Sequence, residues 1–115
     1  MTTDCLFCKI VAGEIPSTVV HETESTFAFR DINPQASTHV VVVPRAHHPN
    51  VAALAEADPA LAGAVLVAAG EIARAEGVAE SGYRLVFNTG PDANQTVFHV
   101  HLHVIGGRPM TWPPG

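Results

Sequence analysis

The chain has 115 residues, which fits one domain with a substantial core, and we treat residues 1–115 as that domain. Hydrophobic residues make up 47% of the sequence and charged residues 15%, a balance that excludes a disordered chain. The formal net charge of -5 argues against a nucleic-acid duplex or an anionic membrane surface as a partner. No apolar run approaches the ~20 residues of a membrane span and no secretory signal pattern is present, so we expect a cytoplasmic protein.

The first half of the sequence predicts a short helix and three strands. Asp4 precedes residues 5–11 as the expected N-cap of the helix, which Gly13 and Pro16 end. Residues 17–22 and 26–30 alternate as two short strands around a turn. Residues 39–43 form a β-branched run that is typical of a buried central strand, and Pro44 ends it.

The second half predicts the longest helix and two more strands. Asp58 is the expected N-cap and Pro59 the first helical residue, and apolar residues recur at helical spacing up to Gly77. Residues 83–88 and 96–105 read as strands on either side of a polar loop. Because short connections favour antiparallel pairing, we expect an α+β domain with a five-stranded antiparallel sheet and helices on one face. A homodimer that extends the sheet would cover an open edge.

The histidine triplet, defined as His99, His101 and His103, alternates with three aliphatic residues near the end of the chain. In a strand the three imidazoles would line one face, roughly 6.5 Å apart. Such a row can bind zinc with a position left open for water. It can equally supply a nucleophile and its electrostatic partners. The residues alone do not separate these two chemistries.

Uncharged hydrogen-bond donors stand directly before the triplet, at Asn88, Asn94, Gln95 and Thr96. A phosphate group or a developing oxyanion requires donors of this kind. Ordinary turn chemistry around residues 90–92 explains the same composition equally well.

Cys5 and Cys8 form a Cys-x-x-Cys pair on the predicted N-terminal helix. On a helix this spacing places both sulfurs on one side, as half of a tetrahedral zinc site. A thioredoxin-like redox pair and two unligated thiols are the alternatives, although no strand precedes the motif as a redox pair would require.

Residues 95–104, Gln-Thr-Val-Phe-His-Val-His-Leu-His-Val, resemble the signature of the histidine triad (HIT) nucleotide-binding proteins, in which three histidines alternate with hydrophobic residues. Other segments resemble the HINT-like branch of that family: residues 7–10, 13–16, 31–36, 38–39, 44–47 and 112–115. The resemblance implies a HIT-like fold and a nucleoside phosphoramidase or nucleotidyl hydrolase. Its substrates would be purine nucleoside monophosphate derivatives, namely amides or esters of AMP or GMP.

The resemblance also implies roles for individual residues. His101 would attack the α-phosphorus and form a covalent nucleotidyl-histidine, which water then cleaves. His103 and His39 would orient the phosphate and the nucleophile, while Thr96 and Gln95 would donate to phosphate oxygens or to the leaving group.

The remaining nucleotide-binding residues follow from the same resemblance. Asn88 and Asn94 would lie beside the phosphate, and Asp31 would accept hydrogen bonds from the ribose hydroxyls. The apolar slot for the purine would consist of Leu6, Phe7, Ile10, Phe29 and Ile32. Core packing explains each of these five side chains equally well.

Family members with the cysteine pair hold a structural zinc ion, and by position His47 and His99 would complete the set of Cys5, Cys8 and two histidines. His48 is an alternative to His47. No organic cofactor is implied.

The chain departs from the family at two positions. Asn94 stands where Gly is usual, and Thr96 stands where Ser is common. Two other functions therefore stay open: a nucleotide-binding regulator that acts through protein partners, and a hydrolase with zinc on the histidine triplet.

Overall fold

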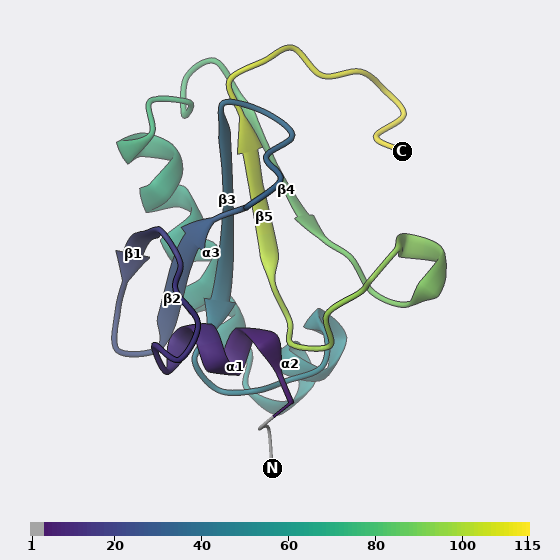
Figure 1. Cartoon of the computed structure of the whole chain (residues 1–115). Coiled ribbons are helices and arrows are strands. Elements are labelled where there is room, and N and C mark those ends of the chain that lie inside the picture. Colours follow the sequence, from purple (N-terminus) through teal and green to yellow (C-terminus); the bar gives the residue numbers. More distant parts are fainter. Residues whose placement is uncertain (1–3) are drawn as a thin grey trace.

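The structure is a computed structural model that describes residues 4–115. Its elements in chain order are α1 (Leu6–Val11), β1 (Val19–Glu22), β2 (Thr26–Arg30), β3 (Thr38–Pro44), α2 (Val51–Ala57), α3 (Pro59–Ala75), β4 (Tyr83–Phe87), the 3-10 turn η1 (Pro91–Ala93) and β5 (Leu102–Gly106) (Figure 1). The strands form one sheet in the order β1-β2-β3-β5-β4, and every neighbouring pair is antiparallel. This confirms the predicted α+β fold with five antiparallel strands, one long helix and a short N-terminal helix.

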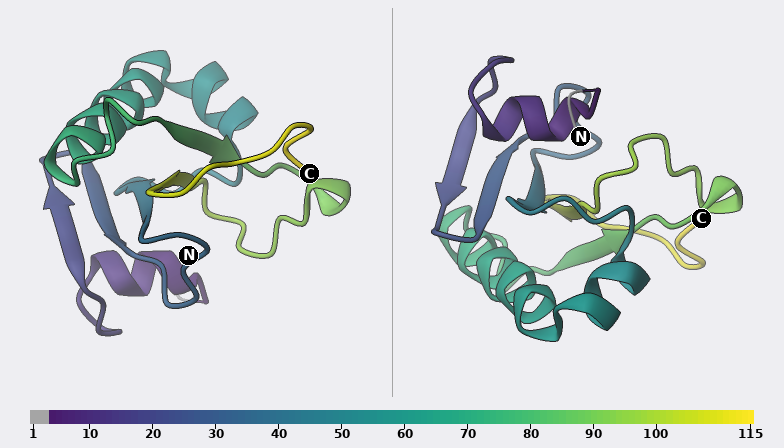
Figure 2. Two further views of the ribbon diagram at one scale, coloured as in Figure 1. Left: turned by 90° about the horizontal axis from the view of Figure 1, so that it is seen from above. Right: turned by 90° about the horizontal axis from the view of Figure 1, so that it is seen from below.

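The helices cover both faces of the sheet, so the expectation of helices on one face was wrong for α1 (Figure 2). Val40 and Val42 pack with α3 in one core, whereas Val41 and Val43 pack with Phe7 of α1 in a second core. All seven residues of β3 are buried. A strand that is apolar on both faces needs cover on both, and α1 supplies part of it on the second face.

The N-caps of the two predicted helices, α3 and α1, differ in how well the sequence predicted them. The Asp58 carboxylate accepts a hydrogen bond from the Leu61 N–H at 3.1 Å, as expected of an N-cap. At α1 the predicted cap Asp4 was wrong, because the Cys5 sulfur accepts from the Cys8 N–H at 3.4 Å instead.

The sequence analysis missed α2, which begins after Asn50. The Asn50 side chain caps it by accepting a hydrogen bond from the Ala53 N–H at 2.9 Å. Leu54 is fully buried in the α3-side core and the partly buried Val51 packs against the same core, so these two apolar side chains fix the helix.

The last strand is shorter than predicted. β5 begins at Leu102, where it pairs with Val42 of β3, so residues 96–101 lie outside the sheet. The alternation nevertheless holds on the apolar side, because Val100 and Leu102 both belong to the α3-side core. His103 is therefore the one member of the histidine triplet that lies on a strand.

The C-terminal tail is anchored at Arg84 of β4, which donates a hydrogen bond to the Thr111 carbonyl. The Arg84 guanidinium lies 6.0 Å from the ring centroid of Trp112, yet the indole is 82% exposed. The backbone of the tail is therefore docked on the sheet, whereas the indole is exposed to solvent. Over residues 4–115, no helix has the length and apolar character needed to cross a bilayer.

Candidate active site and metal centre

One cavity of ≈ 470 Å³ gathers the predicted site residues. It opens on the α1 side of the sheet, between α1, the loop after β2 and the segment before β5. Every residue predicted to act in catalysis or nucleotide binding lines this cavity, except Gln95. The structure adds lining residues that the sequence analysis did not select: Asn33, Gln35, Val41 and Val97.

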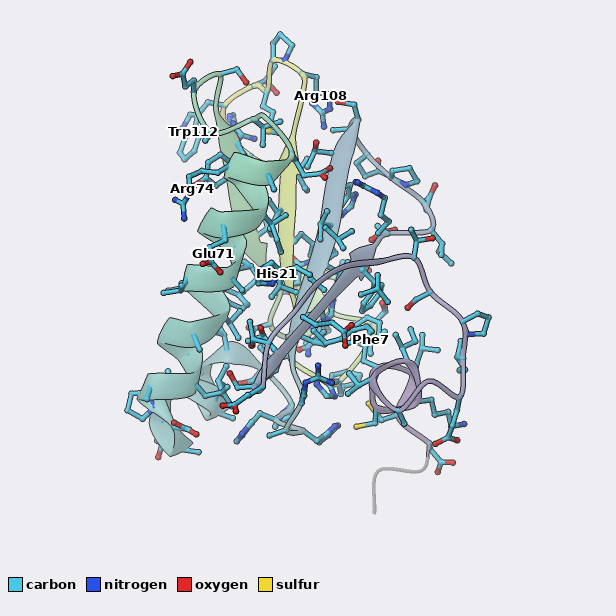
Figure 3. All side chains as sticks on the ribbon, turned by 90° about the vertical axis from the view of Figure 1, so that its left-hand side faces the viewer. Phe7, His21, Glu71, Arg74, Arg108 and Trp112 are labelled. Carbon is cyan, nitrogen blue, oxygen red and sulfur yellow. The ribbon has the colours of Figure 1, made fainter. Side chains whose placement is uncertain are left out.

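The cavity has an apolar wall. Phe7 and Ile10 of α1 and Phe29 of β2 line it and also belong to the α1-side core. Their core packing is therefore confirmed, while their role as a slot for a purine stays a prediction. Figure 3 shows Phe7 between α1 and the sheet. Ile32 lies at the rim, fully exposed. A flat apolar wall beside polar groups is typical of pockets that bind aromatic ligands.

A chain of hydrogen bonds fixes the tautomers of two histidines. The backbone N–H of Gln35 donates to His39 Nδ1 at 3.0 Å, so the proton of the neutral His39 ring is on Nε2. That Nε2–H donates to His103 Nδ1 at 2.9 Å, which places the His103 proton on its own Nε2. His103 therefore presents an N–H rather than a lone pair.

The tautomer of His101 follows from its own backbone contact. His101 Nδ1 lies 2.9 Å from the His99 carbonyl oxygen, which can only accept, so Nδ1 carries the proton. The lone pair is then on Nε2. Because His101 lines the cavity, this nitrogen is the candidate nucleophile.

Burial keeps these imidazoles uncharged at neutral pH. Burial, together with the nearby His101 and His39, lowers the pKa of His103 to about 4, although the Asp31 carboxylate opposes this shift. Burial also lowers the pKa of His101 and of His39, while the Asp31 carboxylate opposes the shift in both. A neutral imidazole retains the lone pair that a nucleophile needs.

The donor set of Asp31, His39 and His103 does not suit a cation. The Asp31 Oδ2 atom lies 3.4 Å from His39 Nε2 and 3.9 Å from His103 Nδ1, so three ligand-type atoms converge. However, His39 Nε2 bears a proton as long as Nδ1 accepts from the Gln35 N–H. Metal binding at Nε2 would cost that hydrogen bond, which disfavours a hydrolase with its zinc ion at His103 of the histidine triplet.

Gln95 does not take the place expected of it beside the phosphate. Its side chain is 8% exposed and accepts a hydrogen bond from the Gly90 N–H at 3.0 Å. Its amide nitrogen donates to the carbonyls of Pro49 at 2.7 Å and Val97 at 3.1 Å. Both amide protons are used, so Gln95 holds the loop in shape rather than facing the cavity.

The two departures from the family both line the cavity. Asn94 adopts the left-handed conformation, with φ of 61°, which explains why Gly is usual at this position. Asn is among the few other residues that tolerate it. Thr96 supplies a hydroxyl to the cavity wall.

A second cluster brings together the four predicted metal ligands, and their ligand atoms all lie within 4.8 Å of one another. His99 Nδ1 is 3.4 Å from both the Cys5 and the Cys8 sulfur, and 3.2 Å from His47 Nδ1. The Cys8 sulfur is 3.5 Å from His47 Nδ1. His48 stays outside the cluster. The structure thus selects His47 over His48.

These distances fit zinc. Tetrahedral geometry with the usual bond lengths puts two zinc-bound nitrogens about 3.4 Å apart, and a nitrogen and a sulfur about 3.6 Å apart. His99 Nε2 donates to the Pro44 carbonyl at 2.8 Å, so the Nδ1 lone pair faces the cluster. Burial lowers the pKa of His99, which favours the neutral ring that ligates a metal.

Comparison with known proteins identifies the family. The sequence pattern of the HIT domain matches residues 12–110. The chain belongs to the HIT family. It is 51% identical to a HIT family hydrolase from Legionella pneumophila, whose crystal structure superposes with a TM-score of 0.93, covering 96% of this chain and 99% of that one.

Two plant relatives are similar over almost the whole chain. A 14 kDa zinc-binding protein from Zea mays is 48% identical over 113 residues, covering 96% of this chain and 87% of its own. The adenylylsulfatase HINT1 of Arabidopsis thaliana is 44% identical over 113 residues, which cover 96% of this chain and 76% of HINT1.

Proposed function

We propose that this HIT protein hydrolyses amides or esters of purine nucleoside 5′-monophosphates at the α-phosphate, through a covalent nucleotidyl intermediate on His101. The proposal rests on the hydrogen bond that His101 Nδ1–H donates to the His99 carbonyl. This bond leaves the Nε2 lone pair of His101 free to attack a phosphorus atom within the cavity. The names of two relatives, a hydrolase and an adenylylsulfatase, agree with this chemistry.

The first step transfers the nucleotidyl group. His101 Nε2 forms a bond to the α-phosphorus as the bond from phosphorus to the amine or alcohol breaks. The leaving group takes a proton that the Thr96 hydroxyl relays from solvent. The Nε2–H group of the neutral His103 ring donates a hydrogen bond to the phosphate oxygens and so stabilises their negative charge.

The second step is the hydrolysis of the intermediate. Water attacks the same phosphorus and loses a proton to solvent, and the bond to His101 breaks. The products are the nucleoside 5′-monophosphate and the neutral imidazole with which the cycle began. Throughout, the His99 carbonyl stabilises the positive charge on the phosphorylated ring by accepting from Nδ1–H.

The cavity supports a purine nucleotide as the ligand. A volume of ≈ 470 Å³ lies within the range of pockets for small ligands. The apolar wall formed by Phe7, Ile10 and Phe29 would stack with the base, while the Asp31 carboxylate would accept from the ribose hydroxyls.

Intact-mass spectrometry after brief mixing with an adenosine 5′-phosphoramidate tests the proposal. We expect a transient adenylyl adduct that is absent in His101→Ala and retained in His48→Ala, because His48 lies outside both sites. Turnover by His101→Ala would refute a nucleophilic His101. AMP binding without turnover by the wild type would instead favour the alternative, a nucleotide-binding regulator.

We also propose that Cys5, Cys8, His47 and His99 hold a structural zinc ion, as the name of the maize relative suggests. Zinc would cross-link α1, the loop after β3 and the segment before β5, and it has no role as a reactant here. Thiolate ligands persist in reducing compartments, which agrees with the proposed cytoplasmic location. Metal analysis of the purified protein tests this assignment.

A homodimer is the proposed assembly. β4 is an edge strand of the sheet, and apolar side chains are exposed on β4 and on α3, at Leu85, Leu66 and Val67. Edge strands are normally covered or paired. Light scattering should therefore give twice the mass of one chain, and Val67→Glu should shift the protein toward the monomer.

A further inference from the structure

The metal cluster and the cavity share helix α1. Cys5 and Cys8 contribute sulfurs to the cluster, whereas Leu6, Phe7 and Ile10 line the cavity. α1 has six residues, and a helix of that length is not stable without tertiary contacts. Any shift of α1 would therefore move the sulfurs and the apolar wall together.

Phe7 connects the two sites through ring contacts. Its ring centroid lies 6.2 Å from that of His99 and 4.9 Å from that of His101, in edge-to-face arrangements with both. It also packs 5.5 Å from Phe29. One side chain therefore lies against a predicted metal ligand, the candidate nucleophile and the rest of the apolar wall.

His99 provides a second connection, through its backbone. Its ring faces the sulfurs at Nδ1 and donates to the Pro44 carbonyl at Nε2, while its own carbonyl accepts from His101 Nδ1–H. Residues 96–101 lie outside the sheet, so no regular strand pairing holds this segment. The peptide that carries the His99 carbonyl is also held by the Val100 N–H, which donates to the His48 carbonyl at 2.7 Å. The orientation of the His99 carbonyl, and with it the tautomer of His101, therefore depends on the His99 ring and on the loop after β3 that carries the ligand His47.

We propose that a metal ion bound by Cys5, Cys8, His47 and His99 positions α1 and the His99 carbonyl and thereby assembles the nucleotide cavity, a role that rests on the proposed function of that cavity. The four ligands are then positioning residues for the reaction. Without the ion, α1 loses its link to the rest of the cluster, so both the apolar wall and the nucleophile lose their alignment. The α3-side core contains no residue of α1, so the sheet itself should stay folded.

The variant His47→Ala tests the proposal at a ligand remote from the nucleotide. The ring of His47 contacts Cys8 and His99 but does not line the cavity, so an effect on nucleotide binding must pass through the metal cluster. His47→Cys restores a zinc ligand, and His48→Ala is the matched control. The measurements are zinc content by mass spectrometry, AMP affinity by calorimetry, and kcat and KM. All are made at a temperature well below the unfolding temperature of each variant.

In His47→Ala we expect zinc content to fall well below one ion per chain, while the Kd for AMP rises and kcat falls, each by about tenfold or more. His47→Cys should recover zinc, AMP affinity and kcat together, which a merely local loss of stability would not predict. His48→Ala should match the wild type. Zinc loss with AMP affinity, KM and kcat all within about twofold of the wild type would overturn the proposal.

Two further outcomes are informative. Should His47→Ala keep its zinc, the same measurements are made on wild-type protein after removal of zinc by a chelator and again after zinc is restored. AMP affinity and kcat that fall and then recover with the zinc support the proposal, and values that stay unchanged overturn it. Should the wild type bind AMP without turnover, the proposed hydrolysis fails, whereas the dependence of AMP affinity on zinc still supports or overturns the positioning role.

Discussion

Replacing Asp31 by Asn separates two roles that its geometry allows. One carboxylate oxygen, Oδ1, accepts from the Asn33 N–H at 2.8 Å, so Oδ2 remains for a ribose hydroxyl. The same Oδ2 lies 3.4 Å from His39 Nε2. Asp31 therefore either binds the ribose directly or acts through the histidines.

The expected magnitude follows from the charge and the exposure of Asp31. A hydrogen bond to an ionised group contributes about 1.5–3 kcal/mol. The Asp31 side chain is 20% exposed, which places it near the lower limit, so Asp31→Asn should raise KM about tenfold. The Asp31 charge raises the pKa of His39 and of His101, so its loss lowers both further and leaves these rings neutral at pH 7.5. We therefore expect little change in kcat.

The assay compares an adenosine 5′-phosphoramidate with its 2′,3′-dideoxy analogue in the wild type and in Asp31→Asn. The wild type should bind the dideoxy substrate about tenfold more weakly, and the substitution should add little to that loss. Equal losses on both substrates would refute ribose recognition, because the effect of Asp31 would then not require the hydroxyls.

Three further predictions concern stability. The pKa of His103 is about 4 in the folded protein and 6.5 ordinarily, so the unfolded chain binds more protons between these values. Urea titrations should therefore show stability falling as pH drops through this window. His103 alone contributes at most about 3 kcal/mol to the fall, so the fall should be smaller in His103→Gln. Asn94→Ala should lower the free energy of unfolding by about 1 kcal/mol, whereas Asn94→Gly should stay within about 0.5 kcal/mol, since φ is 61°. A double-mutant cycle on the bidentate pair of Arg30 and Glu76, with contacts of 2.7 and 2.9 Å, should give a coupling of about 1 kcal/mol or less that salt reduces.

Elements with strong local signals were predicted well. Asp58 and Pro59 mark the beginning of α3, and the run of valines identifies β3, because capping and β-branching act within a few residues. α2 was missed because its alanine-rich sequence has no clear period and only Leu54 is buried. Asn50 was the one local signal that could have indicated it.

The site was predictable in its side chains but not in its backbone contacts. The family resemblance places His39, His101 and His103 in one cavity, and the structure does bring them together. The tautomers, however, depend on the Gln35 N–H and the His99 carbonyl, and a sequence does not show where backbone groups point. The same limit explains Gln95, whose polar side chain is satisfied within its own loop.

The error at β5 has a physical reason that bears on the chemistry. In a regular central strand the carbonyl of His99 would be directed to a neighbouring strand, as the antiparallel ladder requires. Pairing with β3 begins only at Leu102, so the carbonyl is available to accept from His101 Nδ1–H. A longer strand would bury the histidines in the same alternating order but would leave the tautomer of His101 unspecified. The early end of the ladder is thus what allows one imidazole to reach the metal cluster and the next to present a lone pair.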